Sequence, residues 1–112
     1  MPTVPFKDSL KAIADQDPDF ANKILEEAIK SLFSGKADEG RLLLRNYVNA
    51  TIGFPELARR TGKADKNLMR SLSEKGNPTA SNLFEIIQVC MQEEGVSLDP
   101  HIIADAGSEL TL

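Results

Sequence analysis

The sequence predicts one all-α domain of five or six helices that ends in a short irregular tail. Its 112 residues are a usual length for a single domain, and 41% of them are hydrophobic, as in globular proteins. Apolar residues recur every three or four positions along most of the chain, which is the spacing of one helix face. Capping residues precede these stretches and glycines follow them. Residues 1–112 are therefore expected to form one domain.

Two helices are expected in the first third of the chain. Residues 7–15 form a short one with a weak pattern. Residues 17–35 form a stronger one, in which Asp17 suits the N-cap and Pro18 the first helical position. Gly35 is expected to end it. The apolar residues at helical spacing in this helix are Phe20, Ile24, Leu25, Ala28, Ile29 and Leu32.

A third helix is predicted over residues 37–53, with Gly53 as its stop. Gly40 weakens the pattern near the start of this helix, because glycine is a poor helix former. Residues 16–53 as a whole are expected to pack on the two helices that come next. The residues that share the core-facing side of the third helix are Leu44, Tyr47, Val48, Thr51 and Ile52.

A short fourth helix is predicted over residues 54–62. Pro55 suits its first turn and Gly62 suits its end. Ala58 is small and lies four residues before Gly62. A helix-turn-helix needs a small residue where its two helices cross and a residue that turns sharply between them, and this pair meets both needs.

The helix after that turn is predicted over residues 65–75, with Asp65 as a possible cap and Gly76 as the stop. Together with the preceding helix it makes residues 54–76 a candidate helix-turn-helix. The leucines that can hold the two helices on the core are Leu57, Leu68 and Leu72. Burial of each leucine contributes about 1.5–3 kcal/mol.

A last clear helix is predicted over residues 79–95, which support the motif. Thr79 is its expected N-cap, and Asn77-Pro78 turn the chain into it. Residues 96–112 are a tail, in which "VSL" suggests a short strand and "PHIIADA" a helical turn. The core-facing positions of the helix are Leu83, Ile86, Ile87, Cys90 and Met91.

Charge is distributed unevenly along the chain, although the net charge of −4 alone argues against a nucleic-acid partner. Residues 51–80 contain six Lys or Arg and three Asp or Glu, for a local charge of +3. Residues 81–112 contain no Lys or Arg and six Asp or Glu. Local charge governs a contact with phosphate, so the predicted helix-turn-helix lies in the one segment suited to DNA.

The second helix of the motif has an outward face whose chemistry suits the major groove. Arg and Lys recognise guanine, Asn recognises adenine, and an apolar side chain contacts the thymine methyl group. Flanking basic and polar residues would contact phosphates and position the motif. The candidate DNA-binding residues are Arg60, Lys63, Lys66, Asn67, Met69, Arg70, Ser73, Lys75 and Asn77.

Each of these assignments has an ordinary structural alternative. Residues 54–79 could be a plain helical hairpin with solvated charges. Met69 is as consistent with half-buried packing as with a base contact, and Arg59 with Glu56 could be a surface ion pair. Thr79 is a structural cap in either case. Cys90 lies in an apolar stripe and is expected to be inert core.

The segment "LARRTGKADKNLMRSLSEKGNPTASNLFEII" resembles the helix-turn-helix of the HigA-like addiction-module antidote proteins, within the Cro/repressor-like (XRE) class. The upstream segment "ILEEAIKSLFSGKADEGRLLLRNYVNATIGF" is similar to the two helices that precede that motif, so the resemblance covers roughly residues 20–95. It implies a repressor-like helical domain that binds an operator. Lys63 and Ala64 depart from the pattern, which usually has an apolar residue and a Ser or Thr cap, so Asp65 is expected to cap the helix.

Several classes of function are disfavoured. One histidine, His101, and one cysteine cannot supply the usual metal-binding spacings, and no Gly-rich phosphate loop, GxSxG or HExxH is present. Asp15, Asp17 and Asp19 are read as a turn and a cap. We therefore expect no enzyme activity and no cofactor. A single cysteine, no signal-peptide pattern and no apolar run of about 18 residues indicate a cytoplasmic protein without a membrane span.

Two functions are expected from these features and from the resemblance. The first is transcriptional regulation, as an autorepressor of its own operon that binds double-stranded DNA as a homodimer. Candidate dimer surfaces are the first helix and residues 96–104, which contain Val96, Leu98, Ile102 and Ile103. The alternative is an antitoxin that neutralises a RelE-like toxin through its acidic flanks, with or without DNA binding. A short basic reading frame beside the gene would support the antitoxin.

Overall fold

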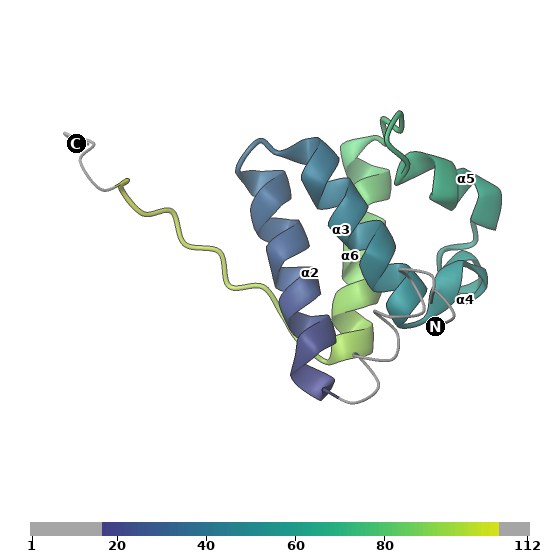
Figure 1. Cartoon of the computed structure of the whole chain (residues 1–112), viewed down its shortest axis with the longest axis horizontal. Coiled ribbons are helices and arrows are strands. Elements are labelled where there is room, and N and C mark those ends of the chain that lie inside the picture. Colours follow the sequence, from purple (N-terminus) through teal and green to yellow (C-terminus); the bar gives the residue numbers. More distant parts are fainter. Residues whose placement is uncertain (1–16, 106–112) are drawn as a thin grey trace, which may run out of the picture.

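The computed structural model describes residues 17–105, and these contain five helices and no strand. The expected helix over residues 7–15 lies outside the described residues. The helices, labelled as in Figure 1, are α2 (Pro18–Phe33), α3 (Ala37–Ala50), α4 (Gly53–Thr61), α5 (Asp65–Ser71) and α6 (Ala80–Glu94). The prediction of an all-α chain is confirmed over this range. None of the described helices is long and apolar enough to cross a membrane.

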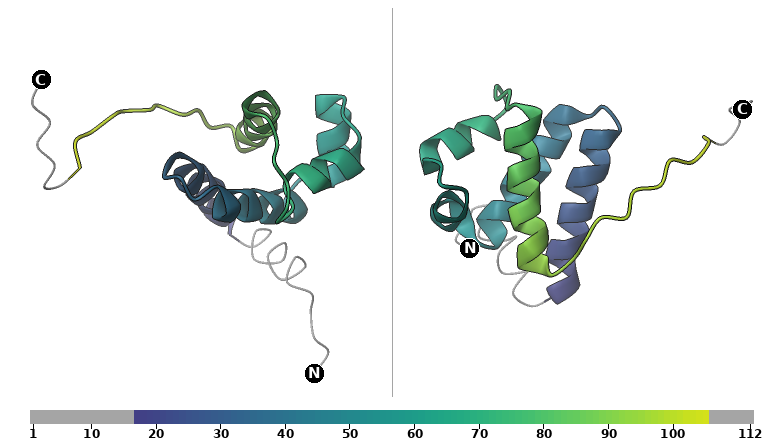
Figure 2. Two further views of the ribbon diagram at one scale, coloured as in Figure 1. Left: turned by 90° about the horizontal axis from the view of Figure 1, so that it is seen from above. Right: turned by 180° about the vertical axis from the view of Figure 1, so that it is seen from behind.

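Helices α2 and α3 run antiparallel and form one side of the molecule, with α6 packed on the other side (Figures 1 and 2). Helices α4 and α5 lie together at one end, and α4 contacts both α3 and α6. The chain after α6 leaves the helices on the side away from α4 and α5 (Figure 1). The α4–α5 pair is therefore carried at the edge of a three-helix frame.

The core lies where the five helices meet. Its members are almost all apolar, and they come from every described helix. They are Ala21, Leu25, Ala28, Ile29, Leu44, Tyr47, Val48, Phe54, Leu57, Leu68, Leu72, Ile86, Ile87, Val89 and Cys90. The core-facing positions expected in α2, α3 and α6 are buried or half-buried there.

The start of α2 agrees with its sequence pattern. Asp17 has extended backbone angles, and its Oδ1 accepts a hydrogen bond from the backbone N–H of Asp19 at 3.0 Å. A carboxylate at this position satisfies a backbone donor that the helix leaves open. Helix α6 begins in the same way, because Thr79 Oγ1 accepts from the N–H of Asn82 at 3.2 Å. Both predicted N-caps are confirmed.

Helix α3 ends earlier than expected. Its last helical residue is Ala50, and Thr51 is the C-cap, so Gly53 is not its stop. Thr51 Oγ1 donates to the carbonyl oxygen of Tyr47 at 2.7 Å, and a side chain bonded in this way competes with the helical ladder. Gly53 opens α4 instead, in a left-handed conformation with φ of 78°.

Two expectations for the tail were wrong over the residues described. Residues 96–98 form no strand, and residues 100–105 form no helical turn. Residues 96–105 instead run as extended chain without regular hydrogen bonding to a neighbour (Figure 1). The chain leaves α6 through Gly95, which is left-handed with φ of 66°, and Val96 donates its N–H to the carbonyl of Met91 at 3.0 Å.

Candidate nucleic-acid interface

The turn between α4 and α5 is set by Gly62. This residue has φ of 72° and ψ of 16°, a left-handed conformation that costs a residue with a side chain about 1–2 kcal/mol. Its N–H donates to the carbonyl of Ala58 at 2.9 Å, which closes α4. Ala58 is half-buried, and Leu57 beside it is fully buried. Gly62 thus makes the sharp turn expected of it, and Ala58 lies half-buried on α4.

The beginning of α5 differs from the prediction. Ala64 is the N-cap and makes no side-chain hydrogen bond, while Asp65 is already the first helical residue. Asp65 therefore does not cap the helix. Its carboxylate lies in the first turn, where negative charge is favourable next to the open N–H groups.

Helix α5 has a buried face and a solvent face. Leu68 is 2% exposed, and Leu72, the residue after the helix, is 1% exposed. The residues on the solvent side are all exposed: Lys66, Asn67, Met69 and Arg70. Met69 is 42% exposed, which favours a surface role over half-buried packing. The helix thus presents two cations, an amide and a thioether to solvent from an anchored backbone.

The end of α5 also differs from the prediction. The helix stops at Ser71 rather than at residue 75, and residues 72–75 form turns. Ser73 Oγ donates to the carbonyl of Arg70 at 2.7 Å, which holds the chain as it leaves the helix. Ser73 is half-buried, whereas Lys75 and Asn77 are exposed on the loop that follows.

Gly76 allows this loop to fold back against the end of α5. A Cβ at this position would lie 2.3 Å from the carbonyl oxygen of Ser71 and 2.5 Å from that of Arg70. Any side chain would clash with the backbone of the helix. The GNPT segment therefore combines a glycine needed for close approach with a cap for α6.

Arg41 of α3 supports the same loop from beneath. It is buried, at 9% exposed, and its guanidinium donates to Asp38 Oδ1 at 2.6 Å and to the carbonyl of Glu74 at 3.5 Å. Its Nε has no hydrogen-bond partner among the described residues. Sequence reasoning missed this residue. A lone arginine on the core-facing side of "GRLLLRN" was the signal that could have identified it.

Two of the candidate cations are held by ion pairs with α6. Arg60 pairs with Glu93 at 2.8 Å, and its side chain is 22% exposed. Lys63 pairs with Glu85 at 2.7 Å, and its side chain is 33% exposed. Sequence reasoning also missed the two glutamates, because partners 22 and 33 residues away leave no local pattern. The other candidate cations, Lys66, Arg70 and Lys75, have no ion-pair partner within residues 17–105.

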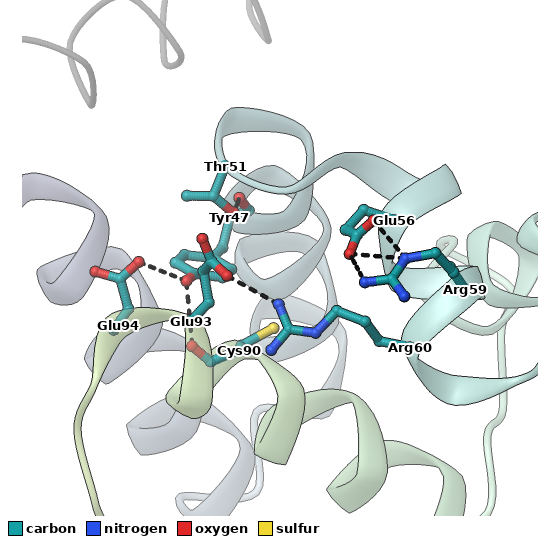
Figure 3. Close-up of polar contacts among 8 residues, drawn as sticks. All are labelled: Tyr47, Thr51, Glu56, Arg59, Arg60, Cys90, Glu93 and Glu94. Carbon is teal, nitrogen blue, oxygen red and sulfur yellow. Dashed lines mark hydrogen bonds and ion pairs between the residues drawn. The ribbon is translucent and has the colours of Figure 1, made fainter.

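Figure 3 shows the polar contacts behind this surface. The Tyr47 hydroxyl donates to Glu94 Oε2 at 2.7 Å and lies 3.3 Å from the carbonyl oxygen of Cys90. Burial raises the pKa of the Cys90 thiol to about 12, and burial together with the bond to Glu94 raises the pKa of Tyr47. Cys90 is fully buried, which agrees with the inert role expected of it.

Arg59 and Glu56 form the surface ion pair that was one of the alternatives for these residues. Arg59 Nε donates to the two carboxylate oxygens of Glu56 at 3.1 and 3.0 Å (Figure 3). These bonds hold the pKa of the Glu56 carboxyl below its usual value. Arg59 is well exposed, so the pair is worth little to stability.

Seven of the nine candidate DNA-binding residues lie on α5 or on the loop after it, and the other two flank it from α4 and the turn.

The described residues contain no group of histidine, cysteine, aspartate and glutamate side chains that could hold a metal ion. Comparison with family models, curated proteins and solved structures finds no match to this chain.

Proposed function

We propose that this protein is a sequence-specific DNA-binding transcriptional regulator, in which α4 and α5 act as a repressor-like helix-turn-helix. The observation that carries the proposal is the two-sided character of α5. Leu68 of α5 and Leu72, the residue after it, are buried, and the exposed side of the helix carries Lys66 and Arg70 without ion-pair partners among residues 17–105. A helix fixed on one side and cationic on the other suits insertion into the major groove.

The local charge supports the same conclusion. Residues 51–80 carry +3, in a chain whose net charge is −4. Lys75 and Asn77 are exposed on the loop that follows α5, which supports a role for them in contacting phosphates beside the groove. In this proposal Asn67, Met69 and Arg70 face base edges, while Arg60, Lys63 and Ser73 flank the backbone of the duplex.

The proposal includes a homodimer that represses its own operon. One helix of seven residues offers few base contacts. A two-fold dimer presents two such helices to half-sites about one turn of DNA apart, and so multiplies the specificity of each. This part rests on the resemblance of residues 20–95 to HigA-like antidotes and on the physics of a small reading surface.

Substitutions at Arg70 and Lys75 test the division of roles. Arg70→Ala should cost about 1–3 kcal/mol of specific binding and relax the preference at one base position. Lys75→Ala should weaken binding to all duplexes alike and reduce the salt slope by about one unit. Fluorescence anisotropy on operator and scrambled duplexes measures both effects.

Lys23→Ala is the matched control, because Lys23 is exposed on α2, far along the chain from the proposed interface. It should leave both affinities unchanged. If Arg70→Ala and Lys75→Ala act no differently from Lys23→Ala, α5 does not read DNA. If the two act identically on both duplexes, the division into base and phosphate contacts is incorrect.

A second candidate function is that of an antitoxin, which is compatible with the first. It is favoured by the composition of residues 81–105, which contain no Lys or Arg and whose last part exposes Ile102 and Ile103. An acidic surface with apolar side chains suits a basic protein such as a RelE-like toxin. Co-expression with a short basic protein encoded beside the gene tests this role, which fails if the two do not purify together.

A further inference from the structure

The chain after α6 carries large apolar side chains that the protein leaves in solvent. We call residues 96–105 the C-terminal arm. Within the arm, Leu98 is 48% exposed, Ile103 is 81% exposed and Ile102 is fully exposed. The arm runs away from the helices (Figures 1 and 2), and ten extended residues reach roughly 30 Å. The adjacent pair Ile102 and Ile103 makes the arm a candidate contact surface.

A hollow with matching chemistry lies between α2 and α6. It consists of two adjoining cavities of about 390 and 260 Å³, and both are lined by Ile29, Met91 and Leu98. We call this hollow the α2–α6 groove. Leu98 of the chain's own arm enters it, and the rest of that arm leaves. The other apolar residues along the second cavity are Phe33, Phe84 and Ile87.

The exposed rim of the groove offers enough area for a stable contact. Phe33 is 68% exposed and Phe84 is 53% exposed. Covering each of these rings, and each of the arm residues Ile102 and Ile103, would remove on the order of 100 Å² from water. Two symmetric contacts of this kind total on the order of 1,000 Å², which is the size a specific interface requires.

The charge of the arm disfavours two other large classes of partner, although Glu26 and Lys30 line the larger cavity of the groove. Residues 81–105 contain no Lys or Arg, and the arm carries Asp99 and Asp105. Nucleic acid and anionic membranes bind through Lys and Arg, so neither suits the arm. The arm and the groove of one chain are both largely apolar, so a second copy of the chain offers each surface a matching one.

We propose that the C-terminal arm of one copy docks in the α2–α6 groove of a second copy, and reciprocally. In such a two-fold dimer, the arm of each chain lies in the groove of the other, so the same contact forms twice and covers the arm and the groove of both chains. It leaves α5 uncovered, because the arm departs on the side away from α4 and α5 (Figure 1). The inference rests on the proposed function, which includes a homodimer. The contact itself does not require DNA binding.

The oligomeric state of the full chain is the first test. Light scattering after gel filtration should give twice the chain mass of 12.2 kDa. Ile102→Asp in the arm and Phe84→Asp in the groove should each raise the dissociation constant at least tenfold. Leu42→Asp is the matched control, since Leu42 is 55% exposed on α3 and belongs to neither surface. Circular dichroism should show unchanged helix content in all three.

Disulfide trapping then locates the contact. Chains carrying Ile103→Cys are mixed with chains carrying Phe33→Cys, and a disulfide-linked pair should form rapidly in the mixture. Cys90 does not compete, because it is fully buried. The double variant, Ile103→Cys with Phe33→Cys, should also link chains to one another, and not close a bond within one chain.

Each other outcome overturns the inference. These outcomes are a monomeric wild type, a dimer that neither Ile102→Asp nor Phe84→Asp weakens, and a disulfide within a single chain. If only a basic toxin covers the groove, then the groove is a binding site for that toxin and not a contact between two copies of the chain. The outcomes also separate the two proposals. A monomer that still reads its operator overturns only the arm contact, and an arm-linked dimer that binds no specific DNA overturns only the proposed function.

Discussion

Tyr47 of α3 and Cys90 of α6 are two titratable side chains that are buried where these helices contact each other. Each comes from a different helix, and the Tyr47 hydroxyl bridges α3 to the last turn of α6 through Glu94. Burial disfavours the charged form of both groups, which is why both pKa values are raised. The native state therefore retains two protons that the unfolded chain gives up in alkaline solution.

The stability of the protein should fall in alkaline solution. The pKa of Cys90 rises from 9.0 to about 12 on folding, so the native state binds more protons than the unfolded state between these values. The contribution of Cys90 is fully present below pH 9 and is lost as the pH rises toward 12. Tyr47 acts in the same direction above pH 10, because its pKa is also raised. The expected loss is on the order of 1 kcal/mol by pH 10.

Urea unfolding at pH 8, 9 and 10 measures this loss. Cys90→Ala is the control, since it removes the thiol and should flatten the dependence between pH 9 and 10 whatever its effect on packing. A wild type as stable at pH 10 as at pH 8 would contradict the assignment. So would a Cys90→Ala variant with an unchanged pH profile.

At the scale of elements, α6 does more than cover the core. Two carboxylates of α6 form ion pairs with cations that flank α5. Glu85 pairs with Lys63 in the turn, and Glu93 pairs with Arg60 on α4. These pairs brace the α4–α5 unit against its support. In the proposed function, each carboxylate would also compete with a DNA phosphate for the same cation.

Glu85→Gln should therefore have opposite effects on stability and on DNA binding. Loss of the partly exposed pair should lower the free energy of unfolding by about 0.2–1 kcal/mol. The released Lys63 should raise affinity for all duplexes and steepen the salt slope by about one unit. Anisotropy titrations at several salt concentrations measure the slope, with Glu27→Gln on α2 as the control for a changed net charge, since Glu27 is exposed and lies outside the α2–α6 groove. A slope equal to that of Glu27→Gln would show that Lys63 does not contact phosphate.

The sequence anticipated those parts of the elements that depend on local chemistry. The caps at Asp17 and Thr79 and the turn at Gly62 each require one residue type at one position, and the structure has all three. The ends of α3 and α5 were not anticipated, because Thr51 and Ser73 bond back to the helix they leave. The support from Arg41, Glu85 and Glu93 depends on contacts between distant residues, which no local pattern encodes.

At the scale of the molecule, two unlike surfaces lie apart. The cationic pair α4–α5 is at one end, and the acidic C-terminal arm departs from the other side (Figure 1). Residues 51–80 carry a local charge of +3 in a chain with a net charge of −4, so in the proposed function they are the segment that approaches DNA. Repulsion between the rest of the chain and the phosphates would then favour a single orientation on the duplex.

A salt-resolved binding titration would decide whether α5 reads DNA. The purified full chain is titrated against the duplex immediately upstream of its own gene and against a scrambled duplex of equal length. If α5 reads DNA, binding to the upstream duplex should be about a thousandfold tighter or more, with log affinity falling steeply and linearly against log salt concentration. Weak and equal binding to both duplexes would contradict it, and would leave the α4–α5 pair as a packing unit only.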